Sequence, residues 1–299
     1  MLVVHVEGGL GNQMFQYAFG ITLAEKLGVP LILDCSFYKN HNGSSLASKR
    51  NFELDIFNLN IRTLESEGFL VKFFAFSIKL LRRIIGANCF DKYFNNFYLI
   101  EDRLKDSSFT DYTKSYSIFK GYWQNERYFS HNRDNILKMF RFKIESQVEN
   151  LEVAQRIQNC NSVSIHVRRG DYVLNSSTKQ SHGTCTLNYY YSAIDYLAKQ
   201  VSNPIFFIFS DDLDWVKVNF ELNYPHEFVE VRMHVCENVD MLLMSKCKHN
   251  IIANSSYSWW AAWLNSQDNK IVIAPKNWFA DINLNLRFSE IVPSEWIKL

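Results

Sequence analysis

The C-terminal half of the chain alternates short apolar strands with helical segments, and this alternation constrains the fold more than any other feature. Strands are expected at 163–167, 204–210, 228–231, 250–253 and 270–274, with helices near 187–200, 215–220, 239–247 and 258–264. Such alternation is typical of α/β folds, in which helices connect the parallel strands of a sheet. The sequence therefore predicts an α/β architecture with a parallel sheet.

The N-terminal half begins with the same pattern and then becomes irregular. Strands are expected at 2–6 and 30–34, around a helix at about 13–27. The aromatic stretch 40–141 shows no regular alternation. Because 299 residues suggest about two domains, we place them at 1–152 and 153–299, and the last residues could pack back on the first domain. Two such domains in series predict a ligand crevice at the carboxyl ends of their strands.

The charge balance and the cysteines exclude several classes of protein. Lysine and arginine total 32 and aspartate and glutamate 31, so no global field attracts nucleic acid. The six cysteines form no Cys-x-x-Cys pair and the eight histidines are dispersed, so we expect a reduced compartment and no metal site. We recognise no signal peptide and no long apolar run, and therefore expect a cytoplasmic protein.

The segment 69–85 is apolar and contains four cations and no acid. A basic amphipathic helix of this kind can lie on an anionic membrane surface, which would place the protein peripherally on the inner membrane. The alternative is a helix that packs on its own domain while its cations reach solvent. Because apolar faces usually find protein first, the sequence favours the packed helix.

An arginine pair follows the strand at 163–167, where Arg168 and Arg169 precede Gly170 and Asp171. Successive side chains on a strand point to opposite faces, so both arginines can reach one ligand only if the chain bends, which Gly170 permits. Guanidinium groups bind phosphate oxygens bidentately and stay charged. The segment therefore indicates a phosphate site. The alternative is a surface pair that forms a salt bridge with Asp171.

Two further polar segments follow strands of the same half. Asp211 and Asp212 come after the strand 204–210, where their carboxylates could accept hydrogen bonds from a ribose or a guanine, or could cap the next helix. The strand 250–253 leads into small polar residues at the start of a helix, a position that suits a phosphate: Asn254, Ser255, Ser256 and Ser258. We expect the tryptophans of that helix in the core: Trp259, Trp260 and Trp263.

A glycine-rich loop follows the first strand and precedes a helix. It half-matches the dinucleotide-binding fingerprint, and Asp34 lies where a ribose-binding acid would be, but Met14 replaces the third glycine. A tight loop at a helix start would still bring Gly11 and the amides of Asn12 and Gln13 close to a ligand. An NAD-dependent oxidoreductase therefore stays an alternative.

With these motifs together, the chain resembles the bacterial α-1,2-fucosyltransferases of glycosyltransferase family 11. The matching segments span nearly the whole length and include Gly-Gly-Leu-Gly-Asn-Gln-Met at 8–14, Gly-Tyr-Trp-Gln-Asn-Glu-Arg-Tyr-Phe at 121–129, His-Val-Arg-Arg-Gly-Asp at 166–171, Phe-Ile-Phe-Ser-Asp-Asp at 207–212 and Ala-Asn-Ser-Ser-Tyr-Ser-Trp-Trp at 253–260. The resemblance implies a GT-B fold, with two Rossmann-like domains that face each other across a cleft. It also implies an N-terminal acceptor domain and a C-terminal donor domain.

The resemblance implies roles for residues of these motifs. Arg169 would hold the β-phosphate of the donor, and Asn12 would face the reacting sugar. A wider set would bind substrate: His166, Arg168, Asp211, Asn254, Ser255, Ser256, Ser258, Gly11 and Gln13. Asp171 joins the catalytic residues, either orienting the arginines or taking the acceptor proton. Glu7 and His166 are the other candidates for that base.

The implied reaction is inverting transfer of L-fucose from GDP-β-L-fucose to the 2-hydroxyl of a galactoside, without a cofactor or an obligatory metal. The product would be a surface polysaccharide such as O-antigen, and the acceptor could be lipid-linked. We expect Tyr122, Trp123 and Tyr128 to shape the acceptor site, because sugars stack on such rings. A non-catalytic carbohydrate-binding protein is a further alternative, beside the oxidoreductase.

Overall fold

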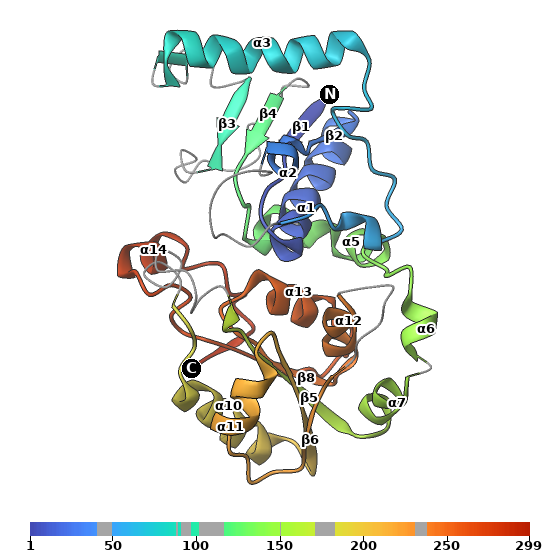
Figure 1. The fold of residues 1–299 in the computed structure, drawn as a ribbon, viewed down its shortest axis with the longest axis vertical. Coiled ribbons are helices and arrows are strands. Elements are labelled where there is room, and N and C mark those ends of the chain that lie inside the picture. The colour runs from blue at the N-terminus through green and yellow to red at the C-terminus, as the bar shows by residue number, and fades with distance from the viewer. Residues whose placement is uncertain are drawn as a thin grey trace. The chain divides into compact units, whose positions relative to one another are not determined.

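The computed structural model describes residues 1–40, 50–87, 89–90, 97–101, 117–149, 151–170, 183–230 and 238–299. The chain forms two compact units, which divide between Phe140 and Arg141 (Figure 1). Each unit is built on its own parallel sheet. The predicted α/β architecture is therefore confirmed in both halves of the chain.

The first unit contains a four-stranded parallel sheet in the order β2-β1-β4-β3. Its strands are β1 (Leu2–His5), β2 (Leu31–Asp34), β3 (Tyr98–Ile100) and β4 (Ser117–Lys120). Its helices are α1 (Leu10–Leu27), α2 (Ser36–Asn40), α3 (Phe69–Ile85) and α5 (Arg133–Met139), with short 3-10 helices at Leu54–Ile56, Glu126–Tyr128 and Ser130–Asn132.

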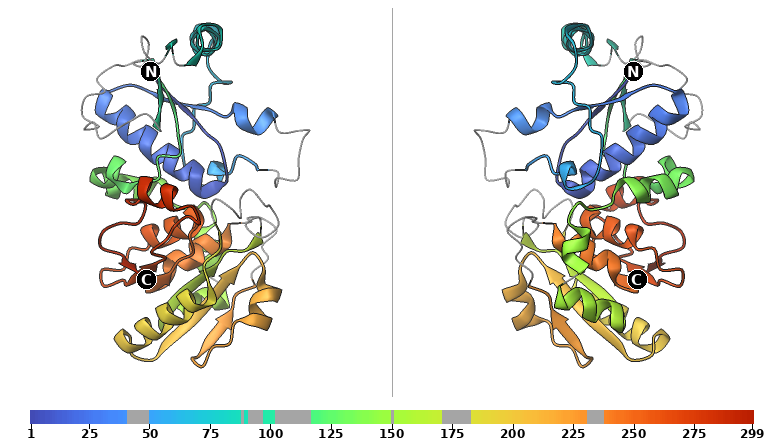
Figure 2. Two further views of the ribbon diagram at one scale, coloured as in Figure 1. Left: turned by 90° about the vertical axis from the view of Figure 1, so that its left-hand side faces the viewer. Right: turned by 90° about the vertical axis from the view of Figure 1, so that its right-hand side faces the viewer.

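Helices α1 and α3 cover opposite faces of this sheet. Val3 and Val4 are both fully buried but point to opposite faces, as neighbours on a strand must. Val4 lies against α1 at Gly20, where an added Cβ would come within 2.9 Å of a Val4 methyl, so only glycine allows this approach. Val3 packs instead with Ala75 of α3. Figure 2 shows α3 end-on, across the strands from α1.

The second unit contains a six-stranded parallel sheet in the order β10-β9-β8-β5-β6-β7. Its strands are β5 (Asn161–Val167), β6 (Pro204–Ser210), β7 (His226–Phe228), β8 (His249–Ile251), β9 (Val272–Ala274) and β10 (Ile297–Lys298). Its helices are α6 (Glu145–Glu149), α7 (Glu152–Asn159), α10 (Leu187–Gln200), α11 (Leu213–Asn219), α12 (Val239–Lys246), α13 (Ser256–Leu264) and α14 (Ile282–Arg287).

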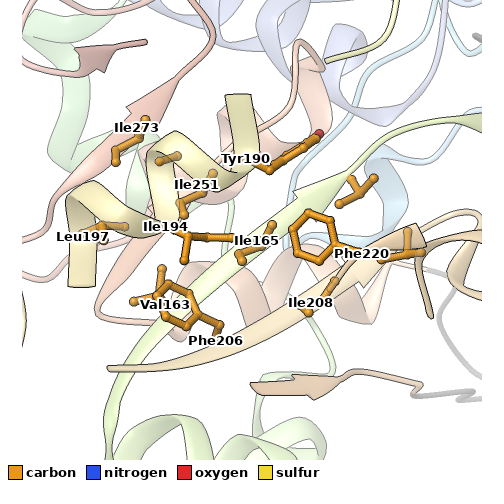
Figure 3. Close-up of a cluster of buried hydrophobic side chains, with 13 residues drawn as sticks. Val163, Ile165, Tyr190, Ile194, Leu197, Phe206, Ile208, Phe220, Ile251 and Ile273 are labelled. Carbon is orange, nitrogen blue, oxygen red and sulfur yellow. The ribbon is translucent and has the colours of Figure 1, made fainter. Parts of the chain in front are cut away.

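Helix α10 and the central strands enclose the main core of the second unit (Figure 3). Ile165 of β5 and Ile208 of β6 are register partners, and both pack with Ile194 of α10. Ala193 and Leu197 of the same helix are also buried there. Because β5 and β6 are thus held over their full length, their carboxyl ends are fixed side by side. This is where the candidate site lies.

Three parts of the fold differ from what the sequence analysis anticipates. The units divide before α6, earlier than the expected boundary at 152/153, and α6 belongs to the second unit, where Lys246 of α12 forms salt bridges with Glu145 and Glu149. Strands β3 and β4 lie inside the stretch that showed no regular pattern. The last strand, β10, pairs in parallel with β9 and so belongs to the second sheet.

Candidate active site

The register of β5 and β6 brings the arginine pair beside two acids. Val167, the last residue of β5, lies opposite Ser210, the last residue of β6. The next residues along these two strands are Arg168 and Asp211, followed by Arg169 and Asp212. The two segments that the sequence analysis singled out separately therefore form one cluster. We name it the arginine loop cluster: Arg168, Arg169, Gly170, Asp211, Asp212 and Trp215.

Asp211 holds both arginines through its carboxylate. Arg168 Nη1 lies 3.1 Å from Asp211 Oδ2, and the backbone N–H of Arg169 donates to Oδ1 at 2.9 Å. Gly170 is required by this contact, because a Cβ at that position would lie 2.4 Å from Oδ2. Asp211 thus organises the loop. Asp171, for which catalytic and salt-bridging roles were predicted, lies outside the described residues.

Arg169 is fixed from two sides. Its Nε donates to Asp212 Oδ2 at 3.1 Å, and its guanidinium carbon lies 3.4 Å from the centre of the Trp215 ring. A planar cation held on an aromatic face keeps its charge and loses little freedom when it binds a ligand. These contacts use Nε and the ring face, so neither involves the terminal nitrogens Nη1 and Nη2.

Asp212 caps helix α11, which was the alternative reading of this segment. Its Oδ1 accepts from the backbone N–H of Trp215 at 3.4 Å, and its own N–H donates to Ser210 Oγ at 3.0 Å. The cap and the arginine contact use the two oxygens of one carboxylate. Capping by Asp212 therefore also positions the ring that supports Arg169.

His166 is buried on β5, two residues before Arg168. Burial, and then the charge of Arg168, lowers its pKa to about 3, so the imidazole is neutral at working pH. Among the described residues its Nδ1 has no hydrogen-bond partner, and its ring centre lies 5.8 Å from that of Tyr257. A side chain so reluctant to hold a proton is a poor general base.

The polar residues around the start of α13 are largely turned into the protein. Asn254 Nδ2 donates to the carbonyls of Gly183 and Trp278, both at 3.1 Å. Ser255 Oγ accepts from the N–H of Tyr257, which makes Ser255 the N-cap. Ser258 Oγ donates to the carbonyls of Ala253 and Ser255. Ser256, the first helical residue, is half-buried. The predicted burial of the three tryptophans of α13 is confirmed: Trp259, Trp260 and Trp263.

Two side chains of this region have no counterpart in the sequence analysis. Trp215 was treated only as the start of a helix, because a cation–ring contact across strands leaves no mark in local sequence. Asp240 lies in the first turn of α12, and burial raises its pKa to about 6. The only sign of Asp240 in the sequence is its position as an acid at the start of an apolar helix. Acids at such positions commonly do no more than stabilise the helix through its dipole.

In the first unit, the glycine-rich loop is held by side-chain amides. Gln13 Nε2 donates to the carbonyls of Gly8 and Asn51, and Gln13 Oε1 accepts from the N–H of Glu53. The fully buried Gln13 thus has its amide engaged with backbone. Asn12 is half-buried, and its Oδ1 accepts from Gln124 Nε2 at 2.7 Å. Gly11 is buried in the first turn of α1.

A charged cluster lies at the carboxyl ends of β1, β2 and β4. His5 Nδ1 is 3.2 Å from Asp34 Oδ2, and His5 Nε2 is 3.2 Å from Glu7 Oε2. Lys79 of α3 pairs with Asp34, and Lys120 lies 3.7 Å from Glu7. Burial acts to lower the pKa of His5, but hydrogen bonds to both acids outweigh it and raise that pKa.

The carboxylate of Asp34 is therefore engaged by groups of the protein itself. It is almost fully buried, and although burial acts to raise its pKa, the bonds to His5 and Lys79 lower it. An acid that binds the ribose of a dinucleotide needs an accessible carboxylate. The geometry around Asp34 removes one of the observations on which the oxidoreductase alternative rested.

The expected acceptor aromatics prove to be mostly core. Trp123 is fully buried and stacks on Phe19, with ring centres 3.9 Å apart and planes within 3°. Tyr128 packs edge-on against both rings and is also buried. Their predicted role as sugar-stacking surfaces is wrong, because a sequence pattern cannot distinguish a buried ring from an exposed one. Tyr122 alone of the three is substantially exposed, at 44%.

Within the parts of the chain that the structure describes, no group of three or more histidine, cysteine or acidic side chains is placed to hold a metal ion. The two parallel sheets, with the candidate residues at their strand ends, have the α/β architecture of the GT-B class. Each unit carries a parallel sheet with helices between its strands, and the candidate residues lie where the strands end.

Comparisons with known proteins agree with this class. The model of the family "Glycosyl transferase family 11" matches residues 1–299, and the chain belongs to this family. It is 35% identical to an alpha-1,2-colitosyltransferase of Escherichia coli, covering 100% of this chain and 99% of the relative. It is 34% identical to the O-antigen biosynthesis glycosyltransferase WbnK of Escherichia coli, covering 98% and 99%.

More distant relatives extend the comparison. A galactoside 2-alpha-L-fucosyltransferase, Sec1 of Mus musculus, is 26% identical over 90% of this chain and 65% of its own length. Among solved structures, NodZ alpha-1,6-fucosyltransferase soaked with GDP-fucose matches with a TM-score of 0.50 and 15% identity, covering 88% of this chain and 92% of that one. This last likeness concerns the fold alone. The protein is a glycosyltransferase, which replaces both the oxidoreductase and the non-catalytic alternatives.

Proposed function

We propose that this glycosyltransferase transfers L-fucose from GDP-β-L-fucose, with inversion, to the 2-hydroxyl of a galactoside acceptor during O-antigen biosynthesis. The linkage is supported by two relatives named for transfer to a 2-position, and the pathway by the full-length relative named for O-antigen biosynthesis. In this proposal the second unit binds the donor and the first unit binds the acceptor.

The arginine loop cluster carries the proposal. Cleavage of the bond between fucose and phosphate builds negative charge on the departing GDP. Arg169, fixed on Trp215 and by Asp212, offers a positive charge that needs no rearrangement to meet the β-phosphate. Preorganised charge of this kind acts most strongly in the transition state and is the main source of electrostatic catalysis. Arg168, paired with Asp211, supports the loop and adds to the local positive potential.

The remaining donor contacts follow from the surrounding groups. His166 is a neutral imidazole, so we infer that it hydrogen-bonds the nucleoside without adding a charge to the site. The N-terminus of α13 at Ser256 suits a phosphate. Because cations and helix dipoles meet the diphosphate charge, we also propose that the reaction needs no metal. Activity should then persist in a chelator such as EDTA.

The acceptor side needs a group that takes the proton of the attacking hydroxyl. The low pKa of His166 argues against it, which leaves Glu7 and Asp171 of the three candidates. A hydrogen bond from His5, and then a nearby Lys120, keeps the pKa of Glu7 low against the opposing effect of burial, so Glu7 is ionised at neutral pH. We also infer that Asn12, whose Oδ1 accepts a hydrogen bond from Gln124 in the same unit, orients a sugar hydroxyl.

A second donor deserves the same test, because a full-length relative at 35% identity is named a colitosyltransferase. Colitose is L-fucose without the 3-hydroxyl. A site that hydrogen-bonds this hydroxyl would reject the deoxy sugar strongly, whereas an apolar site would discriminate weakly. The ratio of kcat/KM for the two donors therefore reports which sugar the site is built for.

The experiment combines the purified chain with GDP-fucose, GDP-colitose or GDP-mannose and a panel of β1,3- and β1,4-linked galactosides, with and without EDTA. Released GDP gives the rate, and NMR of the product gives the linkage. We expect α-1,2-fucosylated product, with GDP-mannose as the inactive control. Preference for GDP-colitose by more than about tenfold would overturn the fucose assignment and keep the reaction class. A product linked elsewhere would overturn the 2-hydroxyl assignment.

A further inference from the structure

Helix α3 has two apolar faces, and among the residues that the structure describes only one of them packs inside the first unit. The inner face packs against the sheet through Val71, Phe74, Ala75, Ile78 and Ile85, which meet Val3, Ile32 and Ile118. Figure 1 shows α3 as a long helix that runs across the direction of the strands of this unit. The packed-helix expectation for 69–85 is thus confirmed, but seven of the twelve apolar side chains of the helix are exposed.

The other face is a continuous exposed stripe. Residues 69, 73, 76, 80 and 84 are spaced by three or four positions, which places them on one side of a helix. We name the outer stripe by its exposed members: Phe69, Leu70, Phe73, Phe76, Leu80, Leu81 and Ile84. Leu70 is 80% exposed and Ile84 is 70% exposed, and the rings of Phe69 and Phe73 stack at 5.8 Å. A contiguous apolar patch of this kind marks an interaction surface.

The charges of α3 identify the chemistry of the partner. The helix carries four cations and no acid. Two of the cations serve the fold, since Lys79 pairs with Asp34 and Arg82 lies over the Tyr98 ring. The other two, Lys72 and Arg83, are exposed. They are eleven positions apart, about three turns, so they flank the outer stripe on the same side.

The length of α3 decides how it can meet a bilayer. Seventeen residues extend about 25 Å, whereas a spanning helix needs about 20 apolar residues. None of the helices in the described part of the chain has the length and apolar character that crossing a membrane requires. A helix with an apolar stripe and flanking cations instead lies in the plane of the membrane interface.

We propose that the outer stripe of α3 inserts into the surface of an anionic lipid bilayer, with Lys72 and Arg83 on the acidic headgroups. Phenylalanine, leucine and isoleucine enter the acyl boundary while the inner face stays packed on the sheet. A second copy of the chain is a weaker fit, because two such helices face to face would bring their cations together with no acid of α3 to neutralise them. This proposal does not depend on the proposed reaction, because its test measures binding to lipid and not catalysis.

The test uses the full chain in flotation with vesicles of phosphatidylglycerol and phosphatidylethanolamine, and with neutral phosphatidylcholine vesicles. We expect the protein to float with anionic vesicles. The variant Phe73→Ser/Phe76→Ser should bind them at least about tenfold more weakly, because it removes apolar side chains from the interface. Lys72→Gln/Arg83→Gln should also lose about tenfold, but only on anionic vesicles. Added salt should weaken the wild type and leave the charge variant nearly unchanged.

A matched control replaces two exposed apolar residues on another helix, Ile282→Ser/Leu286→Ser of α14, and should bind like the wild type. Equal thermal unfolding midpoints would show that each variant is folded, as expected for exposed positions. Unchanged flotation of the stripe variant, or no flotation of the wild type, would overturn the proposal. A wild-type dimer in light scattering that the stripe variant abolishes, without vesicle binding, would overturn it in favour of self-association.

Discussion

The carboxyl ends of the two sheets both carry charged clusters, but the clusters are organised in opposite ways. In the second unit, Asp211 and Asp212 hold two arginines by one terminal nitrogen, one backbone N–H and one Nε. In the first unit, Asp34 is the buried centre and its charge is met by His5 and Lys79. The first arrangement fixes cations in place, and the second encloses an anion.

This difference teaches that an acid at a strand end does not by itself indicate a ligand. Asp34 is nearly inaccessible and serves to tie β1, β2 and α3 together. Asp211 is also engaged, but the loop that it holds carries Arg169, whose terminal nitrogens Nη1 and Nη2 are not part of the contacts that fix it. The presence of acids does not distinguish a binding site from a structural one. The distinction is whether the cation keeps ligand-binding atoms outside the contacts that hold it, as Arg169 does.

The largest expected effect is on the cation at the centre of the second cluster. Arg169→Lys should lower kcat/KM for GDP-fucose at least about 100-fold, because a lysine cannot reproduce a fixed bidentate charge on phosphate. Lys276→Gln, an exposed cation of the same unit, is the control and should keep full activity. Released GDP measures both. Wild-type turnover by Arg169→Ala would remove Arg169 from the mechanism.

The next effect concerns the acid that holds the loop. Asp211→Asn keeps the shape but weakens the contacts to Arg168 and to the backbone of Arg169. We expect kcat/KM to fall about tenfold, mainly through a higher KM for the donor, since the loop would be less preorganised. Steady-state kinetics separate the two constants. An unchanged KM together with a large fall in kcat would contradict a positioning role and indicate direct participation.

In the first unit, the same type of change should alter stability more than catalysis. Asp34→Asn leaves His5 and Lys79 without their shared acid and should lower the free energy of unfolding by about 1–3 kcal/mol, since Lys79 remains partly solvated. Urea unfolding at neutral pH measures this. Glu227→Gln, whose partner Arg156 is on the surface, is the matched control and should cost less than about 1 kcal/mol. A larger loss of unfolding free energy in Glu227→Gln than in Asp34→Asn would contradict this contrast between a surface acid and a buried one.

The smallest effect is a pH dependence. The folded protein holds His166 neutral down to a pKa of about 3, whereas the unfolded chain binds the proton below about 6.5. Stability from this group is therefore present above the unfolded pKa and is lost as the pH falls. Between pH 7 and pH 5.5 the loss should be about 1 kcal/mol. His166→Asn should unfold with a correspondingly shallower pH dependence in urea titrations, and an equal slope would mean that His166 is accessible to protons.

The sequence predicted the elements whose patterns are local. Helix α3 and strand β6 lie at the predicted residues, because their apolar runs have clear ends at Gly68 and Gly86, and at Asp211. Strand β3 was missed because three residues inside an aromatic stretch carry no periodicity. It exists only through its pairing with β4, which brings together Leu99 and Phe119.

The candidate site shows the same limit. The arginine pair and the acids were each visible, because each follows a strand, but their pairing depends on the register of β5 and β6. The aromatic motif at 121–129 was misread for a related reason. Trp123 is buried by its stack on Phe19, a residue of α1 far away in sequence, and no local pattern separates such a ring from one that binds sugar.

The positions of the tryptophans have a spectroscopic consequence. Six of the seven lie in the second unit, at 215, 259, 260, 263, 278 and 296, while the first unit contains only Trp123. Intrinsic fluorescence therefore reports almost entirely on the second unit. Trp215 lies directly under the guanidinium of Arg169, so its emission is a built-in signal for any nucleotide that engages that cation. Donor binding can thus be followed by tryptophan fluorescence, without a label and without the acceptor sugar.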